Sequence, residues 1–124
     1  MSKEIKYYND DVTPKQLAQK IAEIAAEKKG DKINIFSVKK VSSITDYLVV
    51  ISGYNSRHTQ TLAAEIELQI KNTFSIYCRH IDGEKTAEWI VLDFLDVIVH
   101  IFLPETREHY ALERLWADAP VIEA

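Results

Sequence analysis

The segment of residues 47–52 constrains the fold more than any other, because its side chains are apolar almost without interruption. A strand with one face in water alternates apolar and polar residues, whereas a strand covered on both faces is apolar throughout. The run is strand-sized, far below the ~20 residues of a membrane-spanning helix. We therefore expect a central strand, ended by Gly53, in a sheet that carries other elements on both faces.

Helical patterns flank this strand. Thr13 is the expected N-cap of a first helix, with Pro14 at its first position and Gln16 three residues after the cap. This helix should end near Lys29, before Gly30. Its buried stripe should be Leu17, Ile21, Ile24 and Ala25. The other expected elements are a strand at 33–38, a helix from Asn55 or Ser56 to about residue 72, strands at 75–81, 88–93 and 96–102, and a last helix that starts at Pro104 and carries Tyr110, Leu112, Leu115 and Trp116.

The connections predict how the strands pair. A strand, a helix and a strand over residues 47–81 form the unit of a right-handed crossover, so the strands at 47–52 and 75–81 should be parallel neighbours. The last two strands are too close for a crossover and should form an antiparallel hairpin. The expected fold class is α/β: a mixed five-stranded sheet with flanking helices, in the order α-β-β-α-β-β-β-α. The 124 residues suit one domain at 13–120, between a flexible segment at 1–12 and a tail at 121–124.

The faces of the hairpin can be separated by their period of two residues. A four-residue turn from Asp93 to Asp96 is expected, because Phe94-Leu95 is unsuited to a two-residue primed turn, and this register places Trp89 opposite His100. The core face is then the apolar set Ile90, Leu92, Val97, Val99 and Ile101. The other face carries Trp89, Val91, Asp93, Asp96, Ile98, His100 and Phe102.

This second face is open to two interpretations. Taken singly, Trp89 and His100 are more often structural than functional. Together, beside carboxylates and aliphatic side chains, they resemble the core of a protein interface, where Trp and Tyr are enriched. The face is therefore either half covered by the final helix or left open for a partner.

The charges are divided unequally along the chain. Residues 1–81 carry 12 basic and 9 acidic side chains, whereas residues 82–124 carry 3 basic and 10 acidic ones. The acidic C-terminal third disfavours direct binding of nucleic acid and would attract a basic protein, although solubility alone explains it equally well. The single Cys78 and the lack of a signal-like opening segment predict a reducing, cytoplasmic location.

Catalytic constellations are missing from the sequence. Cys78 and His80 share a strand face without a third orienting group, and the four His residues lack metal-ligand spacing. Ser52-Gly53 after a strand is similar to the phosphate-holding turn of nucleotidyltransferases, but their two-metal chemistry needs an Asp-x-Asp pair, which this chain lacks. We expect a nucleotidyltransferase-like scaffold that is not an enzyme and binds no cofactor or metal.

Five strings together resemble the ribosomal silencing factor (Iojap) family. They are residues 46–53 (DYLVVISG) followed by Ser56-Arg57, residues 88–93 (EWIVLD), residues 96–102 (DVIVHIF), residues 107–110 (REHY) and residues 112–116 (LERLW). The resemblance runs from about Thr13 to Pro120. It implies a homodimeric protein that binds large-subunit ribosomal protein fourteen at the inter-subunit face. Occupancy there obstructs joining of the small subunit and lowers translation when nutrients are scarce.

Two residues depart from the pattern of the family. Leu95 and Ala87 stand where the family commonly has glycine. The alternative function is a divergent nucleotidyltransferase or a nucleotide-binding protein.

The resemblance also indicates a binding surface. The residues that fall in the motifs of this surface are Trp89, Asp93, His100, Tyr110, Leu112 and Trp116, and Asp96 joins them from the same hairpin face.

Overall fold

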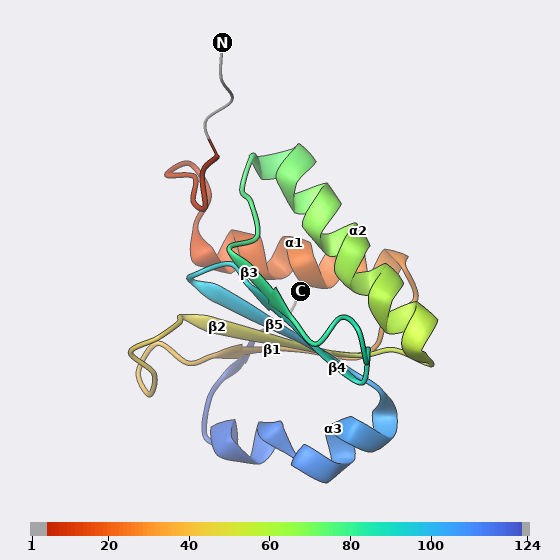
Figure 1. The fold of residues 1–124 in the computed structure, drawn as a ribbon. Coiled ribbons are helices and arrows are strands. Elements are labelled where there is room, and N and C mark those ends of the chain that lie inside the picture. Colours follow the sequence, from red (N-terminus) through yellow and green to blue (C-terminus); the bar gives the residue numbers. More distant parts are fainter. Residues whose placement is uncertain (1–4, 123–124) are drawn as a thin grey trace.

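Residues 5–122 are described by a computed structural model, in which one mixed sheet lies between helices on both faces (Figure 1). Helices α1 and α2 cover one face, and α3 lies on the other side. Within these residues the sheet has six strands in the order β3-β4-β5-β2-β1-β6. The elements are α1 (Pro14–Glu27), β1 (Asp31–Ser37), β2 (Tyr47–Ser52), α2 (Ser56–Phe74), β3 (His80–Asp82), β4 (Trp89–Asp93), β5 (Val97–Phe102), α3 (Pro104–Tyr110), the 3-10 helix η1 (Leu112–Trp116) and β6 (Val121–Ile122).

The two ends of the chain lie partly outside the described residues. Of the segment predicted as flexible, residues 1–4 are not described, and of the predicted tail, residues 123–124 are not described. In the described part, the Asn9 side-chain amide donates to the Phe74 carbonyl at 2.8 Å. Over residues 5–122, the helices are too short or too polar to cross a membrane.

Strand β2 is buried along its whole length, as its composition predicts. Its neighbours are β1, which is antiparallel, and β5, which is parallel. Alternate side chains of β2 enter two apolar clusters. Val49 and Ile51 join the larger cluster with α1 and α2, and Leu48 and Val50 join a smaller cluster on the opposite face. Each such side chain contributes about 1.5–3 kcal/mol when buried, so the sheet needs a layer on both faces.

The expected helices α1 and α2 are confirmed. Thr13 and Gln16 form a reciprocal capping box at the start of α1, and the four residues of the predicted stripe are buried. Helix α1 ends at Glu27, where Lys29 takes a left-handed conformation and the Gly30 amide donates to the Ala25 carbonyl. Asn55 caps α2 by accepting from the amide of His58.

The predicted pairing of the strands at 47–52 and 75–81 is wrong. Strand β3 begins only at His80 and pairs antiparallel with β4 at the edge of the sheet, and the parallel neighbour of β2 is β5. Short links join β3 to β4 and β4 to β5, so these three strands stay together as an antiparallel set that can meet β2 through one edge only. Strand β5 has the apolar composition that this interior position requires. The predicted five strands become six, because Val121–Ile122 pairs with β1.

The predicted hairpin register is also wrong, by two residues. Trp89 lies opposite Phe102, and His100 lies opposite Val91. Leu95 and Asp96 make a tighter turn than expected, in which the Phe94 amide donates to the Val97 carbonyl. A two-residue shift leaves every side chain on its predicted face, so the core face is confirmed and its five residues are fully buried.

The predicted last helix is interrupted. Helix α3 ends at Tyr110, Ala111 adopts a left-handed conformation with φ 46° and ψ 44°, and the chain continues as η1. This break turns η1 back over the smaller apolar cluster, where Leu112 and Trp116 pack. A continuous helix would carry Leu112 onward in the direction of α3 instead.

Substitution of Ala111 by glycine tests this break. Ala→Gly in an exposed helix interior costs about 1 kcal/mol, whereas a left-handed non-glycine residue is strained by roughly 1–2 kcal/mol, which glycine relieves. We expect Ala111→Gly to keep or slightly raise the free energy of unfolding, measured by urea denaturation. The matched control is Ala64→Gly in the exposed face of α2, which should lose about 1 kcal/mol. Equal losses in both variants would indicate a continuous last helix.

Candidate functional site

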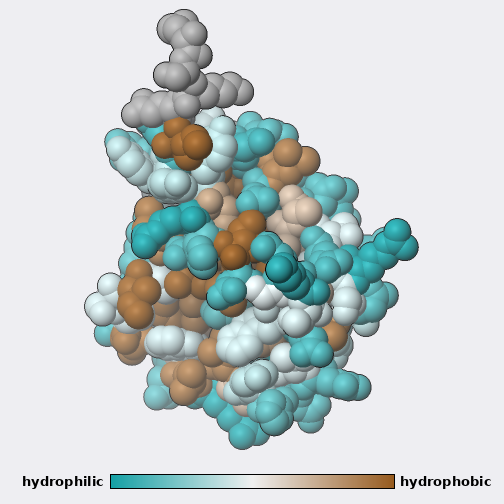
Figure 2. Space-filling view, viewed as in Figure 1, coloured by the Kyte–Doolittle hydropathy of each residue, from teal (hydrophilic) through white to brown (hydrophobic). Residues whose placement is uncertain are grey.

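The outer face of the β4–β5 hairpin is only partly covered. The smaller apolar cluster, formed by Phe36, Val38, Leu48, Val50 and Phe102, is packed by Leu112, Trp116 and Ala119. Farther out on the same face, Val91, Asp93, Ile98 and His100 remain half-buried. Both interpretations of this face therefore hold in part: the C-terminal segment covers one side and leaves the other accessible. Figure 2 shows hydrophobic surface on the left of the molecule, where Figure 1 draws the connection between β1 and β2.

Four rings form an aromatic cluster on this face: Trp89, His100, Phe102 and Tyr110. The Trp89 ring lies 4.9 Å from that of Phe102 and 4.8 Å from that of Tyr110, measured between centroids. Phe102 is fully buried, Trp89 is half-buried, and Tyr110 is 56% exposed. The cluster therefore leads from the core to the surface, which is the arrangement of an anchored contact residue.

A hydrogen bond fixes the orientation of the Trp89 indole. Its Nε1–H donates to Nδ1 of His100 at 3.0 Å. Because an indole nitrogen can only donate, His100 Nδ1 must accept, and the imidazole proton lies on Nε2. Burial lowers the pKa of His100 from 6.5 to about 4, so the ring is neutral at physiological pH. The N–H group of Trp89 is consequently engaged within the chain, and the exposed part of its ring is what remains accessible.

Asp93 and Asp96 lie at the turn, at the other end of the hairpin from Trp89. Asp93 lies four positions after Trp89 along β4, roughly 13 Å away. The Asp93 carboxylate accepts from the amide of Leu95 at 2.8 Å. Asp96 is exposed as a residue. Desolvation of its carboxyl by the atoms around it, together with the negative charge of the neighbouring Asp46, raises the pKa of this carboxyl. The predicted site is therefore one aromatic group and one acidic group, joined by the half-buried strand face.

Leu112 and Trp116 are placed differently from Tyr110. Both pack against the smaller apolar cluster and cover part of it, whereas Tyr110 packs on Trp89. Within residues 5–122, the buried Nε1–H of Trp116 has no hydrogen-bond acceptor. Leu115, predicted only as part of the last helix, is 74% exposed and extends the apolar surface beside them.

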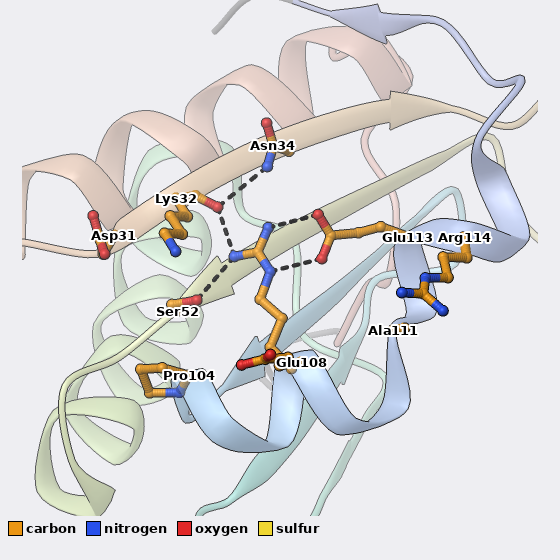
Figure 3. Close-up of a pocket in the computed structure, with 10 residues that line it drawn as sticks. Asp31, Lys32, Asn34, Ser52, Pro104, Glu108, Ala111, Glu113 and Arg114 are labelled. Carbon is orange, nitrogen blue, oxygen red and sulfur yellow. Dashed lines mark hydrogen bonds and ion pairs between the residues drawn. The ribbon is translucent and has the colours of Figure 1, made fainter.

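Arg107 is a functional candidate that the sequence prediction missed. Its side chain is buried at 7% exposure, and its guanidinium donates to the Glu113 carboxylate, the Lys32 carbonyl and the Ser52 hydroxyl (Figure 3). Both Arg107 and Glu113 belong to the motifs of the C-terminal segment. Side chains six residues apart do not meet on a continuous helix, and Ser52 is 55 residues away from Arg107 in sequence. The spacing of residues along the sequence therefore did not indicate these contacts.

The surroundings of Ser52 bear on the nucleotide alternative. A pocket of about 640 Å³ lies at the carboxyl end of β2, lined by Lys32, Asn34, Ser52 and Arg107 among others. The Ser52 hydroxyl accepts from Arg107 at 2.9 Å, and Glu113 accepts from the same guanidinium, so both groups are already engaged within the chain. Among residues 5–122, His, Cys, Asp and Glu side chains nowhere gather as three or more around a possible metal position.

The thiol of Cys78 is not arranged as a nucleophile. It donates to the carbonyl of His80 at 3.3 Å, and burial raises its pKa to about 11, so the reactive thiolate is disfavoured.

Comparisons with known proteins indicate the family to which the chain belongs. The family model described as "Ribosomal silencing factor during starvation" matches residues 11–124. A protein of Halalkalibacterium halodurans named "Ribosomal silencing factor RsfS" is 30% identical over 108 residues, which cover 87% of this chain and 92% of that protein. A protein of Mus musculus named "Mitochondrial assembly of ribosomal large subunit protein 1" is 36% identical over 89 residues, which cover 68% of this chain and 38% of that protein.

A solved structure is similar in fold. The crystal structure of a Chromobacterium violaceum protein has a TM-score of 0.75 and 28% sequence identity, and the match covers 84% of this chain and 83% of that one. The family model and the Halalkalibacterium relative each match most of the chain. The chain therefore belongs to the ribosomal silencing factor (RsfS, or Iojap) family.

Proposed function

We propose that this protein acts in the cytoplasm as a ribosomal silencing factor. It binds the large ribosomal subunit through large-subunit ribosomal protein fourteen at the inter-subunit face. There it sterically blocks joining of the small subunit and so represses translation when nutrients are limiting. Family membership supports the ribosomal partner, and the partly covered aromatic cluster is the observation that supports this surface as the contact.

The proposed contact has an apolar centre and an acidic end. Trp89 is held by packing on Phe102, and Tyr110 packs on Trp89, so this aromatic area loses little side-chain freedom on binding. Asp93 and Asp96 supply charge at the turn, within a C-terminal third that carries 3 basic and 10 acidic side chains. A ribosomal protein is expected to be basic, so these carboxylates should accelerate association.

The nucleotide-binding alternative receives less support from the structure. A phosphate held at Ser52 would have to displace the Arg107 guanidinium or bind beside a carboxylate, that of Glu113. A steric mechanism requires neither nucleotide nor metal, only a surface that holds the protein in place.

Tyr110→Ala tests the aromatic contact. Because Tyr110 is exposed and Trp89 is held by Phe102 and His100, we expect the fold to persist while affinity for purified large subunits falls by roughly 1–2 kcal/mol. Affinity is measured by co-sedimentation and stability by thermal melting. The matched control is Tyr54→Ala, which removes a tyrosine that is 64% exposed at the start of α2 and should not change affinity. Equal affinity of both variants would exclude Tyr110 from the interface.

Neutralising the acidic turn tests the electrostatic contribution. In the Asp93→Asn, Asp96→Asn double variant, the amide oxygen at position 93 can still accept from Leu95, so the turn should persist. Exposed charges are screened with a Debye length of about 8 Å at physiological salt, so we expect a slower association rate and a weaker salt dependence. The control Glu27→Gln, Asp31→Asn removes two exposed charges on the side of the Ser52 end of β2, whereas the turn lies beside the Tyr47 end. A salt dependence that matches the control would mean that the partner does not meet this turn.

We also propose that the protein is a homodimer. The resemblance implies it, and exposed apolar side chains such as Val41, Ile44 and Leu115 provide surface that a second copy can cover. Light scattering at micromolar concentration should give about twice the 14.3 kDa mass of one chain. A species of 14.3 kDa alone would contradict the proposal.

A further inference from the structure

We propose that the buried Arg107 and the partly exposed Glu113 form a latch that positions Tyr110 against Trp89, and that this latch sets the shape of the partner-binding surface. The inference rests on the proposed function, since it assigns how that surface is built. Arg107 is a positioning residue here: at 7% exposure it cannot itself make the contact with a partner.

The latch joins α3 and the adjacent η1 to two segments that are distant in sequence. Arg107 Nε and Nη2 donate to the two carboxylate oxygens of Glu113 at 2.8 and 3.1 Å, and Nη1 donates to the Lys32 carbonyl at 2.7 Å and the Ser52 hydroxyl at 2.9 Å. Helix α3 is thereby tied to η1, to β1 and to the end of β2 (Figure 3). A planar guanidinium suits this task, because it holds a carboxylate bidentately and offers its remaining N–H groups at fixed angles.

Helix α3 has few other means of attachment. It is seven residues long, its N-cap is the apolar Leu103, and Arg107 is the residue of the helix that is buried. Every residue of η1 is at least partly exposed. Helices this short are marginal in isolation and depend on tertiary contacts. Apolar packing of the C-terminal segment comes from Leu112 and Trp116 of η1, so the hydrogen bonds of Arg107 are a main attachment of α3 itself.

The geometry connects the latch to the contact residues. Tyr110 lies three residues after Arg107, on neighbouring positions of the same helix, and Leu112 and Arg114 flank Glu113 in η1. The left-handed Ala111 lies between the two halves of the latch. Rotation of α3 would therefore move the Tyr110 ring, which is 4.8 Å from that of Trp89, away from it. The hydrogen bonds from Arg107 also lower the pKa of the Glu113 carboxyl, which keeps the ion pair charged at physiological pH.

The test uses Arg107→Lys and the milder Glu113→Gln in the full chain. Lysine keeps the charge but cannot bond bidentately, and glutamine keeps the shape but loses the charge. We expect each variant to remain folded by circular dichroism and to bind purified large subunits about tenfold more weakly, or ~1.4 kcal/mol. The controls Arg114→Lys and Glu108→Gln change exposed residues that line the same pocket and should bind as the unaltered protein does.

A double-mutant cycle separates positioning from general destabilisation. If the latch acts through Tyr110, Glu113→Gln should weaken binding much less when Tyr110 is already alanine. Additive losses, or unchanged affinity of Glu113→Gln, would overturn the inference. If Arg107→Lys fails to fold, the Glu113→Gln cycle alone decides it.

A measurement on the free protein distinguishes failure of the inference from failure of the proposed function. The indole N–H resonance of Trp89, identified by its loss in Trp89→Phe, should shift in Glu113→Gln and not in Glu108→Gln, because the Tyr110 ring lies against that indole. A shift without any ribosome binding by the unaltered protein would contradict the proposed function only. An unshifted resonance would contradict the latch.

Discussion

Burial of β2 on both faces is the constraint on which the rest of the structure depends. A strand of six buried residues cannot lie at an edge or face water, so β1 and β5 must flank it and a layer must cover each face. Helices α1 and α2 supply one layer with long apolar stripes. The opposite layer is built from the short α3 and η1, which cover Leu48 and Val50 but not the outer strands. The accessible part of that face is therefore a consequence of how little helix the chain provides there.

The same shortage explains the chemistry of the C-terminal segment. A long amphipathic helix would dock by apolar burial alone, whereas α3 and η1 combine the packing of Leu112 and Trp116 with a partly buried ion pair and its hydrogen bonds. Removing one member of such a pair leaves the other charge uncompensated, which makes the attachment specific in geometry and sensitive to substitution. The neutral His100 acts similarly for Trp89: it satisfies the indole N–H without placing a charge beside the apolar cluster. The candidate surface thus combines rigid support with exposed aromatic area.

Two departures from the family pattern acquire a physical meaning. Ala87 and Leu95, where the resemblance leads us to expect glycine, adopt left-handed conformations with φ of 60° and 71°. Glycine reaches this region without strain, so the backbone gives a physical reason for that expectation. Here the hydrogen bond from the Leu95 amide to Asp93 helps to hold the turn. The Asp93 carboxylate therefore stabilises the turn and also supplies part of the negative charge that we propose faces the partner.

Local patterns in the sequence determined much of this protein: the caps of α1 and α2, the buried β2 and the division of the hairpin into two faces all follow from short-range periodicity and capping chemistry. The candidate residues Trp89, His100 and Tyr110 were also visible, and the structure brings them into one cluster. Tertiary structure alone decided the neighbours of β2, the hairpin register and the break at Ala111. A shift of two residues preserves every face, so the pattern cannot detect it, and the choice of β5 over β3 depends on competition between whole strands. The Arg107 latch was hidden for the same reason: its partners at Lys32, Ser52 and Glu113 meet only after the sheet has brought distant segments together.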